Sequence, residues 1–142
     1  MFDKILLTTD GSEFSQHEVE RAIKAISDDG EIIILSVALQ LKATTPFQWK
    51  KNVDPINNKF FKEAQENVDN MAKKFTHDVN IRKMVLRGIP SEKIIEVAEK
   101  EDVDLIIISA SGKSGLHRFL IGGVAERVLK NSKKDVLLVH ND

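Results

Sequence analysis

The residues of this chain that are best suited to chemistry are the small and polar ones between Ser109 and Gly123. They follow a strand-like apolar run and lead into a helix-like run that begins near Val124. Glycine lets a backbone come close to a ligand, and the N–H groups at a helix start bind anions. This stretch therefore predicts a loop that holds a phosphate chain. Turn geometry alone is the alternative reason for its glycines, Gly112, Gly122 and Gly123.

Other kinds of chemistry find little support in the sequence. Lys113 is placed to neutralise a phosphate, or is simply a solvated loop residue. A Walker A loop would need a glycine where the chain has Ile107, which excludes a P-loop nucleotidase. The four histidines lack metal-ligand spacing, and no serine, histidine and carboxylate can be grouped into a catalytic set. We therefore expect no metal centre and no catalytic base, and at most a weak ATPase.

Length and composition limit the class of protein. The 142 residues suit a single domain over 1–142, and 21 basic against 22 acidic residues give no surface for nucleic acid. No apolar run is long enough to span a membrane. The chain has no cysteine, which fits a reducing compartment. We expect a cytoplasmic protein that binds neither nucleic acid nor membrane.

The apolar pattern switches repeatedly between short continuous runs and helical spacing, which is typical of alternating strands and helices. Strands are expected over residues 4–9, 31–38, 80–86, 104–109 and 135–140. Helices are expected around Val19 to Ile26, Phe61 to Phe75, Pro90 to Ala98, and Gly123 to Asn131, the first of them capped by Ser12. Residues 40–58 have no clear period and are expected to form a loop or a short irregular helix.

These elements predict a Rossmann-like, three-layer α/β/α domain. Right-handed crossovers give a five-stranded parallel sheet, and the order 3-2-1-4-5 places the polar third strand at an edge. The chain then reverses direction between the first and fourth strands, and ligands bind beyond the carboxyl ends of such a pair. Thr9 and Asp10 follow the first strand, and the loop that starts at Ser109 follows the fourth. Both segments should therefore line one crevice.

The fifth strand should form the other edge of the sheet. Its residues Val136, Leu137, Leu138 and Val139 are all apolar, and an exposed apolar edge promotes association. We therefore expect two chains to pair through this strand about a twofold axis, as a homodimer.

Four segments in this order resemble the universal stress protein family. They are residues 4–12, Gly88-Ile89-Pro90, residues 102–108 and the loop 109–123, so the resemblance covers essentially the whole chain. It implies a Rossmann-like domain that is usually dimeric, of which one branch binds ATP and another does not.

The ATP-binding branch carries a glycine, two residues, a glycine, nine residues, and a glycine followed by serine or threonine. Gly112 and Gly122 occupy the second and third glycine positions, whereas Ser109 and Gly123 depart from the first and the last. Gly123 keeps the backbone N–H at the helix start but removes a hydroxyl donor. The resemblance also implies that Asp10 and Val37 contact the adenine. Asp10 as a helix cap and Val37 as a core residue are the alternatives.

Two functions remain open. The favoured one is a stress-response regulatory protein that binds ATP, with Mg²⁺ accompanying the nucleotide, at Thr9, Asp10, Val37, Ser109, Gly112, Lys113, Gly122, Gly123 and Val124. The alternative is a nucleotide-free interaction protein that acts through its dimer surface or through residues 40–58.

Overall fold

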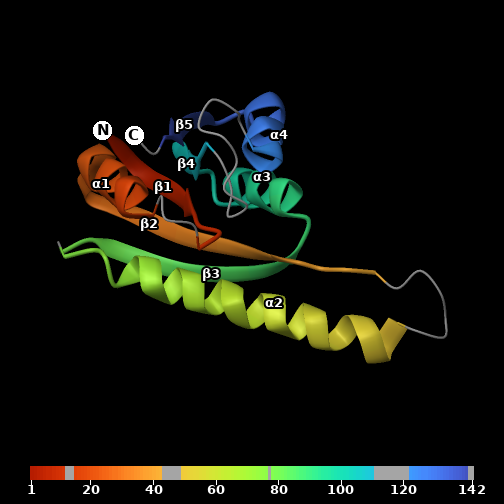
Figure 1. Ribbon diagram of the computed structural model, residues 1–142. Helices are drawn as coiled ribbons and strands as arrows, with labels where there is room; N and C mark the ends of the chain where they lie inside the picture. The colour runs from red at the N-terminus through yellow and green to blue at the C-terminus, as the bar shows by residue number, and fades with distance from the viewer. Residues whose placement is uncertain (12–14, 43–48, 77, 111–121, 141–142) are drawn as a thin grey trace.

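The computed structural model describes residues 1–142 except 12–14, 43–48, 77, 111–121 and 141–142, and for residues 49–52 it describes the backbone only. Nine elements alternate along this part of the chain. In order they are β1 (Phe2–Thr8), α1 (Ser15–Ala25), β2 (Ile26–Leu39), α2 (Trp49–Ala72), β3 (Asn80–Gly88), α3 (Pro90–Lys100), β4 (Leu105–Ser109), α4 (Gly123–Asn131) and β5 (Asp135–Val139). Figure 1 shows them in the colours of the chain. No described helix is both long enough and apolar enough to cross a membrane.

The five strands form one sheet with the predicted order, β3-β2-β1-β4-β5. Every neighbouring pair is parallel, including β1 with β4, where Ile5 is paired with Leu105. The chain therefore changes direction across the sheet between β1 and β4, as the sequence predicts. Parallel strands joined by helices need both faces of the sheet covered.

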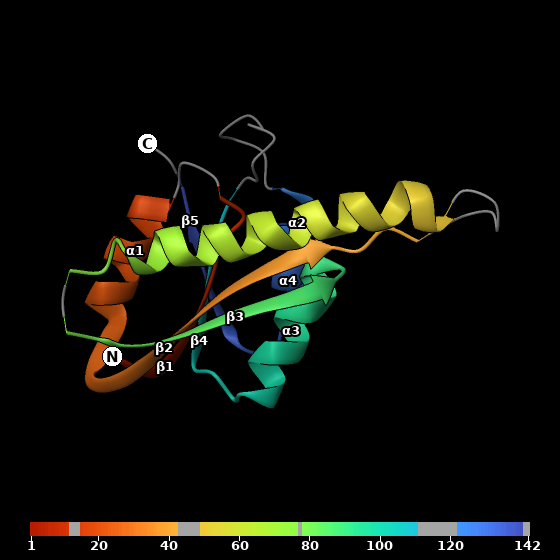
Figure 2. The same ribbon diagram turned by 90° about the horizontal axis from the view of Figure 1, so that it is seen from below.

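Two helical layers cover the two faces, so the α/β/α arrangement is confirmed (Figure 2). Alternate residues of each strand point to opposite faces, and in β1 Leu7 packs against α1 and α2 while Leu6 packs against α3 and α4. The central strands contribute most of the largest fully buried side chains, which explains why their sequences are continuous apolar runs. Each such side chain stabilises the fold by about 1.5–3 kcal/mol.

The boundary between α1 and β2 differs from the expectation. Ile26 was predicted on the buried face of the first helix, but it begins β2 and is paired with Phe2. It is nevertheless buried in the same cluster as Val19 and Ala22 of α1. Helical spacing predicted its burial correctly, and pairing with the start of β1 decided its backbone conformation. The predicted cap Ser12 lies outside the described residues.

The segment 40–58 also differs from the expectation, because α2 begins at Trp49 and continues through Pro55. Proline removes one helical hydrogen bond and normally interrupts a helix. Here Asn57, only 3% exposed, accepts a hydrogen bond from the Leu41 N–H (2.8 Å) and donates one to the Leu41 carbonyl (3.0 Å). This contact between the chain after β2 and α2 supports the long helix, so the loop prediction is wrong for residues 49–58.

A cluster of ion pairs lies at the amino ends of the strands. Arg82 Nη2 contacts Glu101 Oε1 at 2.5 Å and Glu31 Oε1 at 3.1 Å, and Lys4 Nζ lies 3.4 Å from the same Glu101 oxygen. The hydrogen bond from Arg82 holds the pKa of the Glu101 carboxyl below its usual value. These residues tie β1, β2 and β3 to the end of α3.

Candidate functional site

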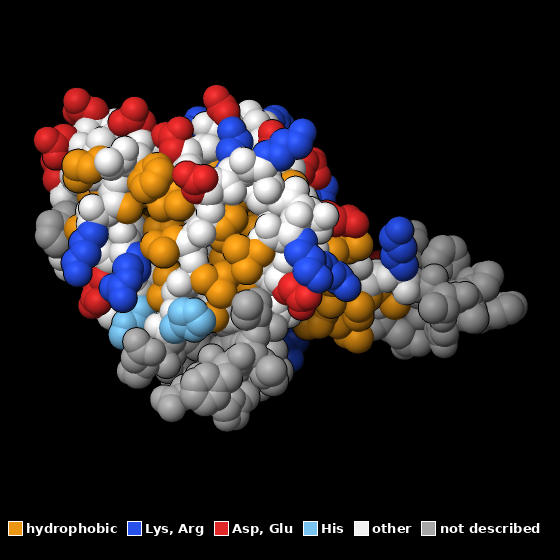
Figure 3. Space-filling view, turned by 90° about the horizontal axis from the view of Figure 1, so that it is seen from above, with side chains coloured by type: hydrophobic (Ala, Val, Ile, Leu, Met, Phe, Trp, Pro, Cys, Tyr) orange, Lys and Arg blue, Asp and Glu red, His pale blue; other side chains and the backbone are white. Residues whose placement is uncertain are grey.

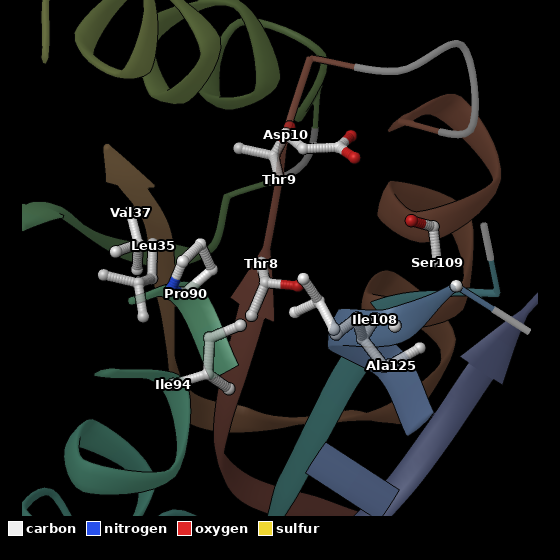
Figure 4. Close-up of a pocket in the computed structure, with 13 residues that line it drawn as sticks. Thr8, Thr9, Asp10, Leu35, Val37, Pro90, Ile94, Ile108, Ser109 and Ala125 are labelled. Carbon is white, nitrogen blue, oxygen red and sulfur yellow. The ribbon is translucent and has the colours of Figure 1, made fainter. Parts of the chain in front are cut away.

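A cavity of about 260 Å³ lies at the opposite end of the sheet, beyond the carboxyl ends of β1, β2 and β4 (Figure 4). The first residues of α3 and α4 close it from the side. This is the switch point of the sheet, where open α/β folds bind ligands. It is lined by Thr8, Thr9, Asp10, Leu35, Val37, Pro90, Ile94, Ile108, Ser109, Gly122, Gly123, Val124 and Ala125.

Seven of the nine residues singled out in the sequence line this cavity. They are Thr9, Asp10, Val37, Ser109, Gly122, Gly123 and Val124. The other two, Gly112 and Lys113, lie outside the described residues. The structure thus brings the segments after β1, β2 and β4 together with the start of α4.

The sequence reasoning missed the apolar wall of the cavity. Leu35, Pro90, Ile94, Ile108 and Ala125 form most of it, together with the half-buried Val37. Figure 4 shows Leu35, Val37 and Pro90 on one side, and Asp10 and Ser109 on the other. A signal was present for α3, because a helix that follows a parallel strand begins at the same edge of the sheet as the cavity. A flat apolar group with polar edges suits such a space.

The turn after β1 is shaped by its own hydrogen bonds. The Gly11 N–H donates to Thr9 Oγ1 at 3.2 Å, and Gly11 adopts a φ of 81°, which favours glycine. A Cβ built at Gly11 would lie 2.5 Å from Oδ1 of Asn67 in α2. The turn is therefore pressed against α2, and it holds Asp10, the only charged side chain among the described lining residues, at the cavity.

The backbone of β2 offers a second polar feature at the cavity. Pairing of β2 with β1 ends at Leu35, whose carbonyl accepts a hydrogen bond from the Thr9 N–H, while pairing with β3 continues to Leu39. Because alternate residues of a parallel strand bond to the same side, the N–H and carbonyl of Val37 also point toward β1. β1 has already ended there, so this donor and acceptor face the cavity instead of a strand.

The start of α4 supplies further donors. Gly122 is its N-cap residue and has no side-chain cap, and its own N–H is used in a hydrogen bond to the Ala110 carbonyl at 2.7 Å. The next N–H groups of a helix have no partner within it and attract anions. A Cβ built at Gly123 meets no atom of the described residues within 4 Å, and Gly123 lines the cavity. Within that part of the chain, the helix start is open toward the cavity.

A buried acid lies behind the polar side of the cavity. Glu18, in the first turn of α1, is 1% exposed, and sequence reasoning did not single it out. Burial raises the pKa of the Glu18 carboxyl well above its usual range, and the nearby Asp10 carboxylate raises that pKa further. Glu18 lies four residues before Ala22 and therefore shares the buried face of α1. This spacing was the sequence signal that could have identified Glu18 as buried.

Comparison with known proteins gives consistent results. The family model described as "Universal stress protein family" matches residues 1–140. Universal stress protein MJ0531 of Methanocaldococcus jannaschii is 34% identical over 98% of this chain and 82% of its own length. Universal stress protein MJ0577 of the same organism is also 34% identical, over 98% of this chain and 95% of its own.

Solved structures agree with the sequence comparison. The structure of MJ0577 superposes with a TM-score of 0.84 at 30% identity, covering 100% of this chain and 98% of that one. A universal stress protein in complex with cAMP superposes with a TM-score of 0.65 at 25% identity, covering 98% and 97% of the two chains. The sheet order, the helical layers and the match over 140 residues lead to one conclusion: the chain belongs to the universal stress protein family.

Proposed function

We propose that this protein is a stress-response regulatory protein that binds ATP, or another adenine nucleotide, in the cavity between the loops that follow β1 and β4. The observation that carries the proposal is the make-up of that cavity, which combines an apolar wall, a backbone donor and acceptor that point to the side where β1 has ended, and the start of α4.

The adenine base of the nucleotide fits the apolar side of the cavity. Adenine presents a donor, its N6 amino group, beside an acceptor nitrogen, and the Val37 carbonyl and N–H offer the complementary pair. Leu35, Pro90 and Ile94 would cover the faces of the ring. Asp10, across the cavity, would accept a hydrogen bond from the sugar or the base.

The phosphates fit the side formed by the start of α4. Gly122 and Gly123 allow close approach of the backbone, and the first N–H groups of the helix favour negative charge. Lys113, outside the described residues, remains a predicted phosphate ligand. The described part of the chain contains no group of three or more His, Asp or Glu residues that could hold a metal ion by itself. Mg²⁺ would therefore be held mainly by the phosphates.

The solved relative with cAMP supports an adenine nucleotide as the ligand class, since cAMP contains adenine. We identify no catalytic base among the described lining residues, so binding is the proposed function and hydrolysis would be weak at most. The proposal includes a homodimer joined through β5. A cytoplasmic location also remains a prediction.

A nucleotide-free interaction protein is the second candidate, because apolar side chains near the start of α2 are exposed. Leu39 is 43% exposed and Ile56 is 41% exposed. Together with Leu41 they lie where β2 and α2 extend beyond the rest of the sheet (Figure 2). A partner protein could use this surface whether or not the cavity is filled.

The test begins with the purified protein. We expect adenine nucleotide in the supernatant after denaturation, and saturable binding of Mg-ATP by titration calorimetry. The variant Asp10→Asn keeps the shape of the side chain but removes its charge. A hydrogen bond to a charged group contributes about 1.5–3 kcal/mol, so the affinity should fall by about 10- to 100-fold.

The matched control is Asp54→Asn, which removes an acid that is exposed on α2 and does not line the cavity. Its affinity should equal that of the unaltered protein. Absence of co-purified nucleotide, together with no binding of Mg-ATP or AMP at millimolar concentration, would overturn the proposal and favour the interaction protein.

A further inference from the structure

A second cavity lies on the face of the sheet that α1 and α2 cover, whereas α3 and α4 close the candidate nucleotide cavity. Its volume is about 190 Å³, well above the share of about 30 Å³ that one water molecule needs. Thr9 lines both cavities, and no other described residue does so. The turn after β1 therefore separates two spaces, of which the proposed function uses one.

The lining of this second cavity is mostly polar. Asn67 and Asn70 line it from α2, where residues three apart share one face of the helix. Lys74 lines it from the turn that follows α2. The turn after β1 and the start of α1 contribute Gly11 and Ser15. The cavity therefore offers an ammonium group, two side-chain amides and a hydroxyl.

These polar groups are not used elsewhere in the described part of the chain. Its ion pairs employ other cations, and Lys74 enters none of them. The Asn67 and Asn70 amides likewise make no hydrogen bond to a described residue. Lys74 and Asn67 are nevertheless only partly exposed. Partly buried polar groups without a protein partner are completed by water or by a ligand.

The charge of the lining selects the class of ligand. Lys74 is the only charged side chain among the described residues that line the second cavity. Of the described acids beside these residues in the sequence, Glu66 and Asp69 line a groove next to β3, and Asp10 lines the candidate nucleotide cavity. Glu18 of α1 is buried and lines neither cavity. A cation would be repelled by the ammonium group, whereas an anion would be attracted by it and could accept hydrogen bonds from the amides.

We propose that the second cavity binds a small oxyanion of the phosphate class, with Lys74 as the charged group and Asn67 and Asn70 as hydrogen-bond donors. An ammonium group binds phosphate as a point charge, and charge-assisted hydrogen bonds are about twice as strong as neutral ones. This site goes beyond the proposed function, because it exists whether or not the other cavity holds a nucleotide.

The backbone at Gly11 should report binding at this site. A Cβ built at Gly11 would lie 2.5 Å from Oδ1 of Asn67, so the Asn67 amide rests against the turn after β1. An anion bound by this amide should change the surroundings of the Gly11 N–H. Gly123 lines the other cavity, so its N–H reports phosphate bound there instead.

The experiment titrates inorganic phosphate into the isotope-labelled full chain, followed by NMR at constant ionic strength with chloride as the reference anion. We expect saturable shifts of the side-chain amide signals of Asn67 and Asn70 and of the Gly11 N–H. Lys74→Gln removes the charge and should weaken phosphate binding by about tenfold or more. Asn70→Asp adds a negative charge at an exposed position of α2, so the fold should be kept and phosphate binding lost.

Lys73→Gln is the matched control, because it removes the neighbouring ammonium group, which is exposed and does not line the cavity. It should bind phosphate as the unaltered protein does. Equal weakening in Lys73→Gln and Lys74→Gln would show a general response to net charge and would overturn the site.

A second titration, with Mg-ATP present, distinguishes free phosphate from the phosphates of a nucleotide. Phosphate should still shift the Asn67 and Asn70 signals. Loss of these shifts would mean that nucleotide phosphates reach the second cavity, and would overturn an independent site. Shifts confined to Gly123 and the rest of the start of α4 would place the phosphate in the other cavity, and would overturn the inference as well.

Discussion

Single residues give the cavity two different sides. Asp10 is its only described charged side chain, and its carboxylate is directed toward the side of Ser109, away from Leu35, Val37 and Pro90. Its other polar groups are the hydroxyls of Thr8, Thr9 and Ser109 and the backbone groups at Val37 and at the start of α4. Backbone groups are held by the fold itself, so such a site is preorganised before any ligand arrives.

Gly123 provides a test by gain of affinity. A Cβ added there meets no atom of the described residues within 4 Å, so we expect Gly123→Ser to fold normally and to place a hydroxyl donor at the helix start. A hydrogen bond to a charged phosphate contributes about 1.5–3 kcal/mol, and we expect ATP to bind at least about tenfold more tightly. Gly123→Ala adds the carbon without the hydroxyl, and equal gains in both variants would contradict this explanation.

Glu18 should affect the stability of the folded protein. Its pKa is raised by burial in the folded protein, so the folded state favours the protonated form. The contribution of this proton to stability is present below the unfolded pKa of about 4.3 and is lost as pH rises through the folded value. Glu18→Gln should therefore have a higher melting temperature than the unaltered protein at about pH 8, and this advantage should shrink toward pH 4. An advantage that does not change with pH would contradict the prediction.

For single residues, the sequence predicted which residues lie at the cavity better than it predicted which residues they contact there. Asp10, expected at the crevice because it follows the first strand, and Val37, expected there from the family resemblance, both line the cavity. The partners of each residue depend on contacts between distant segments, such as Ile94 of α3 beside Val37 of β2, and spacing along one segment does not contain them. Glu18 escaped notice because a glutamate on a helix is usually exposed.

Among the elements, α2 differs most from expectation. It begins beyond the edge of the core, passes through Pro55, and reaches the turn at Gly11 through Asn67. Strand order followed from the polar pattern of the third strand, which marks one edge, and from the continuous apolar runs of the first and fourth strands, although the apolar β5 is an edge strand as well. The start of α2 did not, because its helix is supported by Asn57 bonding to Leu41, a contact between two elements.

Asn57→Ala tests this support. Removal of the amide leaves the N–H and carbonyl of Leu41 without their partner, and loss of these two partly buried hydrogen bonds should lower the free energy of unfolding by about 1–3 kcal/mol. Urea unfolding measures the loss, and hydrogen exchange should become faster at Leu41. The neighbouring exposed Asn58 is the control, since Asn58→Ala should stay within about 0.5 kcal/mol. Equal effects in the two variants would show that the contact does not support the helix.

For the molecule as a whole, the edge formed by β5 remains the predicted dimer surface. Figure 3 looks onto the end of the molecule that carries β5 and α4, where apolar side chains gather. Leu129 of α4 is 41% exposed, and Val136, Leu137 and Leu138 are only half buried. An uncovered edge strand with apolar neighbours is a template for pairing with a second copy.

Leu138→Pro tests pairing through this edge. The Val139 carbonyl accepts a hydrogen bond from the Ala110 N–H. The backbone N–H and carbonyl groups of Val139 and Leu137 therefore point toward β4, and the Leu138 N–H points to the open edge of the sheet. Proline is tolerated at an edge strand where its missing N–H faces outward. We expect sedimentation to show a dimer for the unaltered protein and a folded monomer for Leu138→Pro. A dimer that survives this change would place the interface elsewhere.

The two ends of the sheet hold different kinds of interaction. The charged cluster of Lys4, Arg82 and Glu101 ties the strands together at the amino end, and the cavity occupies the carboxyl end. Ion pairs respond to salt and temperature, whereas the cavity responds to the shape of a ligand. Substitutions that adapt such a chain to a new habitat can therefore lie at one end of the sheet. Substitutions that adapt it to a new ligand can lie at the other end, so the two kinds can accumulate independently.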